Sequence, residues 1–159
     1  MNASAPDTGT IWSWLAEVPD PELPVLSIVD LGIVRDVRWD KGRDGSPTLC
    51  IAITPTYTAC PATAAIGRDI QHAMSAHGIA RIRLEVSLAP PWTTDAIGAA
   101  AREKLRSYGI APPERSRAVV CPRCASADVR EVSRFGSTPC KALYRCRACL
   151  EPFDLFKCH

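Results

Sequence analysis

The stretches Cys121-Pro122-Arg123-Cys124 and Cys146-Arg147-Ala148-Cys149 decide how the last part of this chain folds. Each is a Cys-x-x-Cys pair, and 21 residues separate the two pairs. Each pair can offer two thiolates from one tight turn, so the two turns together form a tetrahedral sulfur cage, which suits Zn²⁺ and which Fe could also occupy. Because the segment is too small to bury much core, we expect the metal to hold it together.

This spacing is close to that of zinc ribbons, so we interpret Cys121, Cys124, Cys146 and Cys149 as ligands of a structural metal. The alternative is a dithiol redox site, which usually needs one pair on a thioredoxin-like helix, not two pairs that bracket strands. Two further cysteines of the tail, Cys140 and Cys158, exceed the four ligands needed. Each is an extra ligand, part of a second site with His159, or a spare core thiol.

The composition is that of a globular protein with an uneven charge. The 159 residues allow one ordinary domain plus a small module. The net charge of +2 divides into −2 for residues 1–109 and +4 for residues 110–159. A nucleic-acid footprint is normally denser and interleaved with aromatic residues, so we interpret the basic tail as a solvated surface and expect no nucleic-acid partner.

The sequence shows no secretory signal, because Met1–Trp14 has neither a basic region nor an apolar run before Asp7. The stretch Leu49–Gly67, which has no charge and no histidine, contains two prolines, four threonines and a tyrosine, and cannot span a membrane. We therefore expect a cytoplasmic protein with no membrane partner. Its eight cysteines then serve as thiols and metal ligands, not as disulfides.

The pattern of apolar residues predicts an α+β protein. We expect a small mixed α/β domain at 1–109, a linker at 110–120, and a four-cysteine zinc-ribbon (rubredoxin-like) module at 121–159. In the first domain we expect helices over Ile11–Glu17, Pro61–His77 and from Thr93 or Thr94 to Tyr108, and strands over Ile33–Trp39, Thr48–Thr54 and Arg81–Leu88. In the module we expect strands over Val129–Phe135 and Ala142–Arg145. The second helix is long enough for a parallel crossover between the second and third strands.

Cys60 is a second candidate site residue, because it directly precedes Pro61 at the start of the second helix. At a helix N-cap, unpaired backbone N–H groups and the positive end of the helix dipole favour a thiolate. The loop could present a nucleophile, a cluster ligand or a metal relay. The equal alternative is a buried cysteine that fills space, as we expect for Cys50 in the middle of a strand.

Three acids, Asp20, Glu22 and Asp30, precede the first predicted strand in a proline-rich loop. Asp30-Leu31-Gly32 suggests a turn that aims the carboxylate, since Gly32 can adopt positive φ. The acids either join Cys60 around a pocket or serve as turn-makers and helix-end anchors. The spacing alone does not identify a paired-carboxylate catalytic site.

The sequence lacks a glycine-rich phosphate loop, His-Glu-x-x-His, Gly-x-Ser-x-Gly and the Glu-x-x-His of di-iron bundles. We therefore do not expect an autonomous oxygenase, kinase or hydrolase.

Several stretches resemble the metal–sulfur cluster assembly family, whose members help to mature iron–sulfur proteins: Asp20–Val25, Val29–Val34, Thr54–Pro61 and Pro91–Asp95. The tail is more specific. Phe135–Cys146, Glu151–Asp154 and Phe156–Cys158, joined to the first domain, resemble the family of D subunits of the bacterial phenylacetyl-CoA epoxidase (phenylacetate-degradation) system. The similarity runs from about Trp12 to His159.

This resemblance implies an accessory role in aerobic phenylacetate degradation, beside a di-iron oxygenase subunit and an iron–sulfur reductase that are the expected partners. It implies assembly or repair of their iron centres, with Cys60 as the reactive or metal-handling thiol and Asp20, Glu22 and Asp30 in the accompanying acidic motif. A transient Fe or Fe–S cluster would then be the cargo. The alternative is a non-catalytic ribbon that docks partner proteins; a homo-oligomer stays open.

Overall fold

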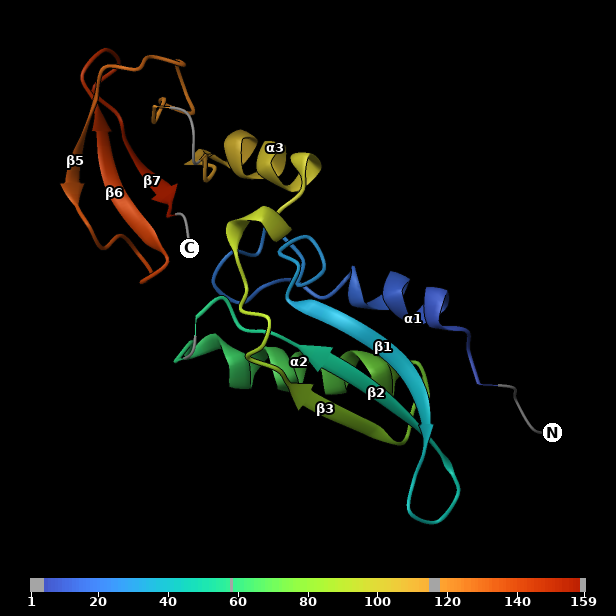
Figure 1. Cartoon of the computed structure of the whole chain (residues 1–159). Helices are drawn as coiled ribbons and strands as arrows, with labels where there is room; N and C mark the ends of the chain where they lie inside the picture. Colours follow the sequence, from blue (N-terminus) through green and yellow to red (C-terminus); the bar gives the residue numbers. More distant parts are fainter. Residues whose placement is uncertain (1–4, 58, 115–117, 158–159) are drawn as a thin grey trace. The chain divides into compact units, whose positions relative to one another are not determined.

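The computed structural model describes residues 5–57, 59–114 and 118–157 (Figure 1). The chain divides into two compact units, Met1–Trp92 and Thr93–His159, and each has its own sheet. The mixed α+β fold expected from the sequence is confirmed. In the described part of the chain, no helix is long and apolar enough to cross a membrane.

The first unit is a three-stranded sheet with two helices (Figure 1). The strand order is β1-β2-β3; β1 pairs antiparallel with β2, and β2 pairs parallel with β3, as the long crossover predicts. Helix α2 makes that crossover, and helix α1 packs on β1 and α2. The elements are α1 (Thr8–Leu15), β1 (Val34–Lys41), β2 (Pro47–Ile53), α2 (Ala62–Ala76) and β3 (Ile82–Val86).

The central strand β2 is apolar on both faces, as the sequence indicates. Leu49, Ile51 and Ile53 share the face on which α2 packs, and all three are buried. Cys50 is also fully buried, but it lies on the opposite face, where Arg38 and Arg83 flank it on the neighbouring strands.

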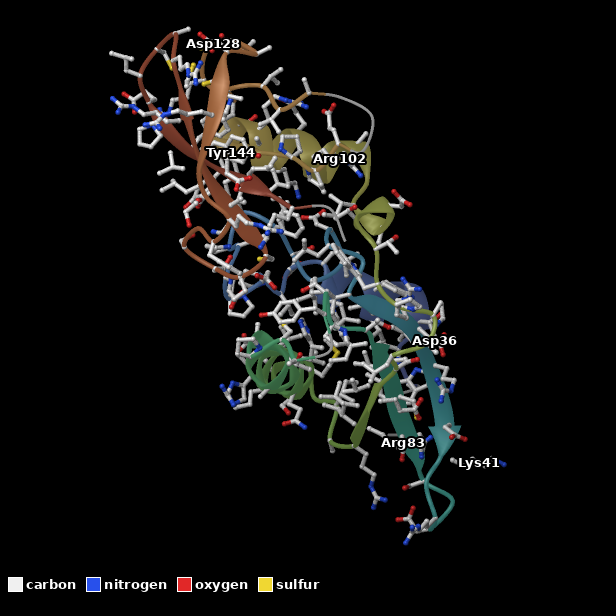
Figure 2. All side chains as sticks on the ribbon, turned by 60° about the vertical axis from the view of Figure 1, so that its left-hand side comes forward. Asp36, Lys41, Arg83, Arg102, Asp128 and Tyr144 are labelled. Atoms are coloured by element: carbon white, nitrogen blue, oxygen red, sulfur yellow. The ribbon has the colours of Figure 1, made fainter. Side chains whose placement is uncertain are left out.

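Ion pairs across the strands cover this second face of the sheet. Arg38 contacts Asp36 at 2.7 Å and Glu85 at 2.8 Å, and Arg83 contacts Asp40 at 2.6 Å. Asp36 and Arg83 mark this face in Figure 2. These ion pairs run along β1 and diagonally across β2, so the exposed face is neutralised within the unit.

Some predicted elements differ from the structure. Helix α1 begins three residues early, because Asp7 caps it by accepting the Thr10 N–H at 3.0 Å. Val86 and Leu88 continue the alternation of apolar residues in the third predicted strand, which would place them inward, but they are 56% and 54% exposed. Strand β3 is the last strand of its sheet. The alternation of apolar and polar residues shows which side chains share a face, but not whether another element packs over that face at the sheet edge.

The second unit begins with the third predicted helix, which is interrupted. Thr94–Ala96 forms a 3-10 helix η1, Gly98 is the N-cap of α3 (Ala99–Tyr108), and Gly109 ends α3 with φ of 91° as expected. Tyr108, the last residue of α3, is 62% exposed. Arg102 donates hydrogen bonds to the carbonyl oxygens of Thr94, Ile97 and Pro113 and so ties these turns together (Figure 2).

The ribbon sheet of this unit has the order β4-β7-β6-β5. Its strands are β4 (Ile110–Ala111), β5 (Val129–Ser133), β6 (Lys141–Cys146) and β7 (Pro152–Phe156). Neither β4 nor β7 was predicted, and β4 lies within the predicted linker. A two-residue strand has too little pattern to be found from sequence. The domain boundaries 1–109, 110–120 and 121–159 stay predictions.

We expect Ile51→Ala to lower the free energy of unfolding of the first unit by about 2–5 kcal/mol, because it leaves a cavity at a fully buried position. Val86→Ala on the adjacent strand is the control and should cost less than about 0.5 kcal/mol, since Val86 is exposed. Urea unfolding followed by tryptophan fluorescence measures this unit alone, because all four tryptophans precede Thr93. Equal effects of the two substitutions would contradict the packing described.

Candidate functional site

Four cysteine sulfurs converge in the second unit. The Sγ atoms of Cys121, Cys124, Cys146 and Cys149 all lie within 4.8 Å of one another. The shortest contacts run between the two turns: Cys121 to Cys149 is 3.7 Å, and Cys124 to Cys146 is 3.6 Å. Four sulfurs bound at about 2.3 Å around a tetrahedral zinc ion lie about 3.8 Å apart. The arrangement therefore fits one tetrahedral metal ion.

The backbone of each turn is shaped around its pair of cysteines. The N–H of Cys121 donates to the Ser126 carbonyl at 2.9 Å, and the N–H of Cys146 donates to the Glu151 carbonyl at 3.0 Å. The residues after the pairs, Ala125 and Leu150, have φ of 59° and 66° and are the two non-glycine residues with positive φ in the described chain. Metal-binding turns often carry glycine here, because this conformation strains other residues.

Hydrogen bonds and the neighbouring sulfurs change the acidity of the thiols in opposite directions. The backbone N–H of Cys149, 3.5 Å from the Cys146 sulfur, is the main cause that lowers the pKa of Cys146 to about 7. The N–H of Glu151 lowers the pKa of Cys149, but burial and the three nearby sulfurs outweigh it and raise that pKa. The cage holds thiolates readily only when a cation offsets their mutual repulsion.

Cys140 is not part of this group. It lies at the opposite end of β6 from Cys146, is buried, and places its sulfur 3.1 Å from the Thr138 hydroxyl. These contacts match the spare core thiol among the alternatives. Cys158 and His159 lie outside the described residues.

Cys60 is half-buried and lies two residues before the first residue of α2. The structure places Pro61 at the N-cap, one residue later than predicted, because the Cys60 N–H closes a turn onto the Tyr57 carbonyl at 3.1 Å. The Cys60 carbonyl still accepts the N–H of Thr63 in the first helical turn at 3.2 Å. The thiol is therefore held at the start of α2 and is partly open to solvent.

The acidic residues build turns. Asp20 is 5% exposed, and its Oδ1 accepts the N–H groups of Glu22 at 2.9 Å and Leu23 at 2.8 Å. Asp30 and Ser27 form a reciprocal pair: Asp30 Oδ2 accepts the Ser27 N–H at 3.1 Å, and Ser27 Oγ accepts the Asp30 N–H at 3.0 Å. These contacts match the turn-making role that the sequence left open.

The topology of the sheet places three loops at one edge. The acidic loop precedes β1, the Cys60 loop follows β2, and the loop that ends at Trp92 follows β3. Strand β1 is antiparallel to β2 and β3, so its start lies at the carboxyl ends of β2 and β3, and all three loops meet there (Figure 1). The Thr54 N–H donates to the Ile33 carbonyl at 2.8 Å, so the Cys60 loop starts beside the end of the acidic loop.

Trp92 ties the third loop to this edge and was not recognised as a site residue from sequence. Its indole N–H donates to the Leu31 carbonyl at 2.7 Å, and the side chain is 4% exposed. A buried indole needs a hydrogen-bond acceptor, so a tryptophan directly after Pro90-Pro91 was the sequence signal that this loop is fastened to another segment. The residues around Trp92 do not identify the Leu31 carbonyl as the acceptor.

Comparisons with known proteins agree with both parts of this description. The family model described as "PaaD zinc beta ribbon domain" matches residues 108–157, and the model described as "Iron-sulfur cluster assembly protein" matches residues 9–78. A curated Escherichia coli K12 protein, named as the putative D subunit of 1,2-phenylacetyl-CoA epoxidase, is 47% identical over 161 residues, which cover 96% of this chain and 94% of that protein. The chain belongs to the family of these epoxidase D subunits.

Two solved structures share the fold of the first unit. The crystal structure of a domain of unknown function, DUF59, from Bacillus anthracis is 29% identical, has a TM-score of 0.54, and covers 61% of this chain and 89% of its own. A conserved hypothetical protein from Thermotoga maritima is 27% identical, has a TM-score of 0.53, and covers 66% and 98%. The family resemblance and the fold class stated from the sequence are confirmed for this D-subunit homologue.

Removal of the metal should unfold the ribbon and leave the first unit intact, because the cysteine cage holds a very small core: Ala111, Cys121, Cys146 and Phe153. We expect a strong chelator to collapse the amide NMR dispersion of residues 118–157, while the tryptophan emission stays unchanged. Cys146→Ser should do the same, whereas the control Cys140→Ser should keep one metal per chain. A ribbon that stays dispersed without metal would disprove the role of the cage.

The positive φ at Leu150 predicts a second test. Leu150→Val should weaken zinc affinity about fivefold, since a β-branched residue adds about 1 kcal/mol of strain at this φ. Leu150→Gly should bind at least as tightly as the wild type. Because Leu150 is 61% exposed, little packing is lost in either variant. Competition with a chromophoric chelator measures the affinity, and equal values for the two variants would count against strain in the turn.

Proposed function

We propose that this D-subunit homologue is an accessory maturation factor of the multicomponent phenylacetyl-CoA epoxidase, which assembles or repairs its iron–sulfur or di-iron centres. The observation that carries the proposal is the position of Cys60: half-buried, at the start of α2, on the sheet edge that also receives the acidic loop. The match of residues 9–78 to the iron–sulfur assembly model supports it.

In this proposal the Cys60 sulfur holds iron or a cluster as cargo, and the thiol loses its proton to solvent when the Fe–S bond forms. Asp20 and Asp30 act mainly by holding the turns that border the Cys60 loop, since their carboxylates accept backbone N–H groups. Glu22, half-buried in the Asp20 turn, is the third member of the acidic motif. A half-buried thiol suits transient binding, because the cargo must both enter and leave.

The ribbon has a separate task in this proposal. We assign Zn²⁺ to the four-cysteine cage, because zinc has no redox chemistry and four thiolates close its coordination shell, as in structural sites. The ribbon then supplies a stable surface and takes no part in holding the cargo. In this proposal the predicted domain 1–109 holds the cargo, residues 110–120 are the linker, and residues 121–159 are the docking module.

An anaerobic reconstitution tests the cargo site. With Fe²⁺ and sulfide added to zinc-loaded protein, we expect the wild type to gain iron and a cluster absorption band, and Cys60→Ser to lose most of both. Cys50→Ala is the matched control, because Cys50 belongs to the same unit but is fully buried, and it should behave like the wild type. Metal analysis per chain measures iron and zinc together. Unchanged zinc shows that the ribbon is folded, and unchanged tryptophan emission shows that the first unit, which carries both substitutions, is folded.

The alternative function, a docking adaptor with an inert Cys60, gives a different result in cells. Cys60→Ser would then leave phenylacetate-dependent growth intact, while Cys121→Ser would abolish it by unfolding the ribbon. The maturation proposal requires that both variants impair growth. Equal iron uptake by wild type and Cys60→Ser, together with normal growth, would decide for the adaptor.

A further inference from the structure

Two arginines stand directly opposite each other on the outer face of the ribbon. Arg130 on β5 is the cross-strand partner of Arg145 on β6, and both are exposed. The neighbouring pairs Val129–Cys146 and Glu131–Tyr144 turn to the other face, where Val129, Tyr144 and Cys146 join the core. Like charges directly opposite on paired strands repel, so this pair destabilises the isolated ribbon.

The nearby carboxylates do not neutralise this face. Asp128 contacts Arg147 at 3.7 Å, and Glu131 accepts the Tyr144 hydroxyl at 3.2 Å. Asp154 accepts the Ser137 hydroxyl at 3.0 Å and lies 3.6 Å from the Lys141 ammonium. Among the residues that the structure describes, Arg130 and Arg134 therefore have no ion pair.

An exposed aromatic ring follows the same strand. Phe135 is 68% exposed, and the Lys157 ammonium lies 4.6 Å from the centre of its ring. Lys157 also donates to the Arg134 carbonyl at 3.1 Å, and Ser133 Oγ donates to the Phe135 carbonyl at 2.9 Å. These contacts hold the ring at the surface. Exposed aromatic and arginine side chains are the residues that most often dominate binding energy at interfaces.

We infer that this basic strip (Arg130, Arg134, Phe135, Arg145 and Lys157) docks an acidic segment of another protein. Carboxylates between Arg130 and Arg145 would turn their repulsion into attraction, and an apolar side chain of the segment would cover Phe135. Strand β5 is last in the order β4-β7-β6-β5, so the described residues leave one of its edges open to an extended segment.

The spacing of charge favours an acidic protein over a nucleic acid. Within residues 118–157 seven basic side chains are interspersed with four acidic ones, and the carboxylate of Asp128, two residues before Arg130, lies 3.7 Å from Arg147. A phosphate backbone needs a continuous basic track, and the interspersed carboxylates would repel it. A protein segment with a few carboxylates needs only the local pair.

The test rests on the proposed function only for the choice of partners, the other epoxidase subunits. The full zinc-loaded chain is co-purified with them and treated with a carbodiimide, which couples amines to carboxylates in direct contact. The chain has four lysines: Lys41, Lys104, Lys141 and Lys157. We expect mass spectrometry to find crosslinks from Lys157 to an acidic segment of one of these proteins. Crosslinks confined to Lys41 or Lys104 would overturn the inference, as would absence of any complex.

Arg130→Glu separates binding from folding. It should weaken the complex about tenfold or more, yet raise the melting temperature of the ribbon, because a carboxylate would then face Arg145. Arg43→Glu, an equal charge change at an exposed residue of the loop between β1 and β2, should leave the affinity unchanged. Phe135→Ala should also weaken binding, unlike Tyr108→Ala, which removes an aromatic side chain of similar exposure at the end of α3. Unchanged affinity in Arg130→Glu would overturn the inference.

Two further readouts keep the conclusions apart. A random-sequence DNA duplex is titrated into the wild type and into Arg130→Glu, and neither should bind it measurably at physiological salt. The inference of an acidic-protein partner would be overturned if the wild type binds the duplex, Arg130→Glu does not, and no complex with the epoxidase proteins forms. Iron uptake is measured on the same samples. Loss of docking with normal iron uptake in Arg130→Glu is the expected result, so a failure of docking is distinguishable from a failure of the Cys60 proposal.

Discussion

Repulsion among four sulfur atoms governs the second unit. The sulfurs of Cys121, Cys124, Cys146 and Cys149 lie within 4.8 Å, and the rest of the ribbon core is small. Four thiolates this close are stable only around a cation, so metal binding and folding of the ribbon are one equilibrium. The positive φ of Ala125 and Leu150 is held by the same equilibrium, because the turns must close tightly enough to aim all four sulfurs inward.

The first unit concentrates its chemistry by topology. One antiparallel and one parallel pairing bring three loops to a single edge of the sheet, and hydrogen bonds from Thr54 to Ile33 and from Trp92 to Leu31 fasten them there. The carboxylates of Asp20 and Asp30 serve this arrangement by closing turns. Cys60 is half-buried at this edge, as the proposed reversible binding of a metal cargo would require.

Local signals predicted much of this arrangement, and long-range contacts account for the rest. The cysteine spacing, the stop at Gly109 and the two apolar faces of β2 depend on neighbouring residues, and the structure agrees with each. The exposure of Val86, the strand β4 and the acceptor of Trp92 depend on partners far along the chain, which periodicity does not identify. The Asp7 cap was a local signal that was overlooked.

The two exposed sheet faces handle charge in opposite ways. In the first unit, each arginine on the sheet face meets a carboxylate of its own unit: Arg38 pairs with Glu85, and Arg83 pairs with Asp40. In the ribbon, Arg130 faces Arg145. Neutralisation within the chain was therefore available to this protein, and the ribbon lacks it where Arg130 faces Arg145; Phe135 is exposed beyond the other end of β5. Water solvates these exposed arginines, but carboxylates of another molecule would place an opposite charge between them, and this is the contact through which we infer that a partner docks.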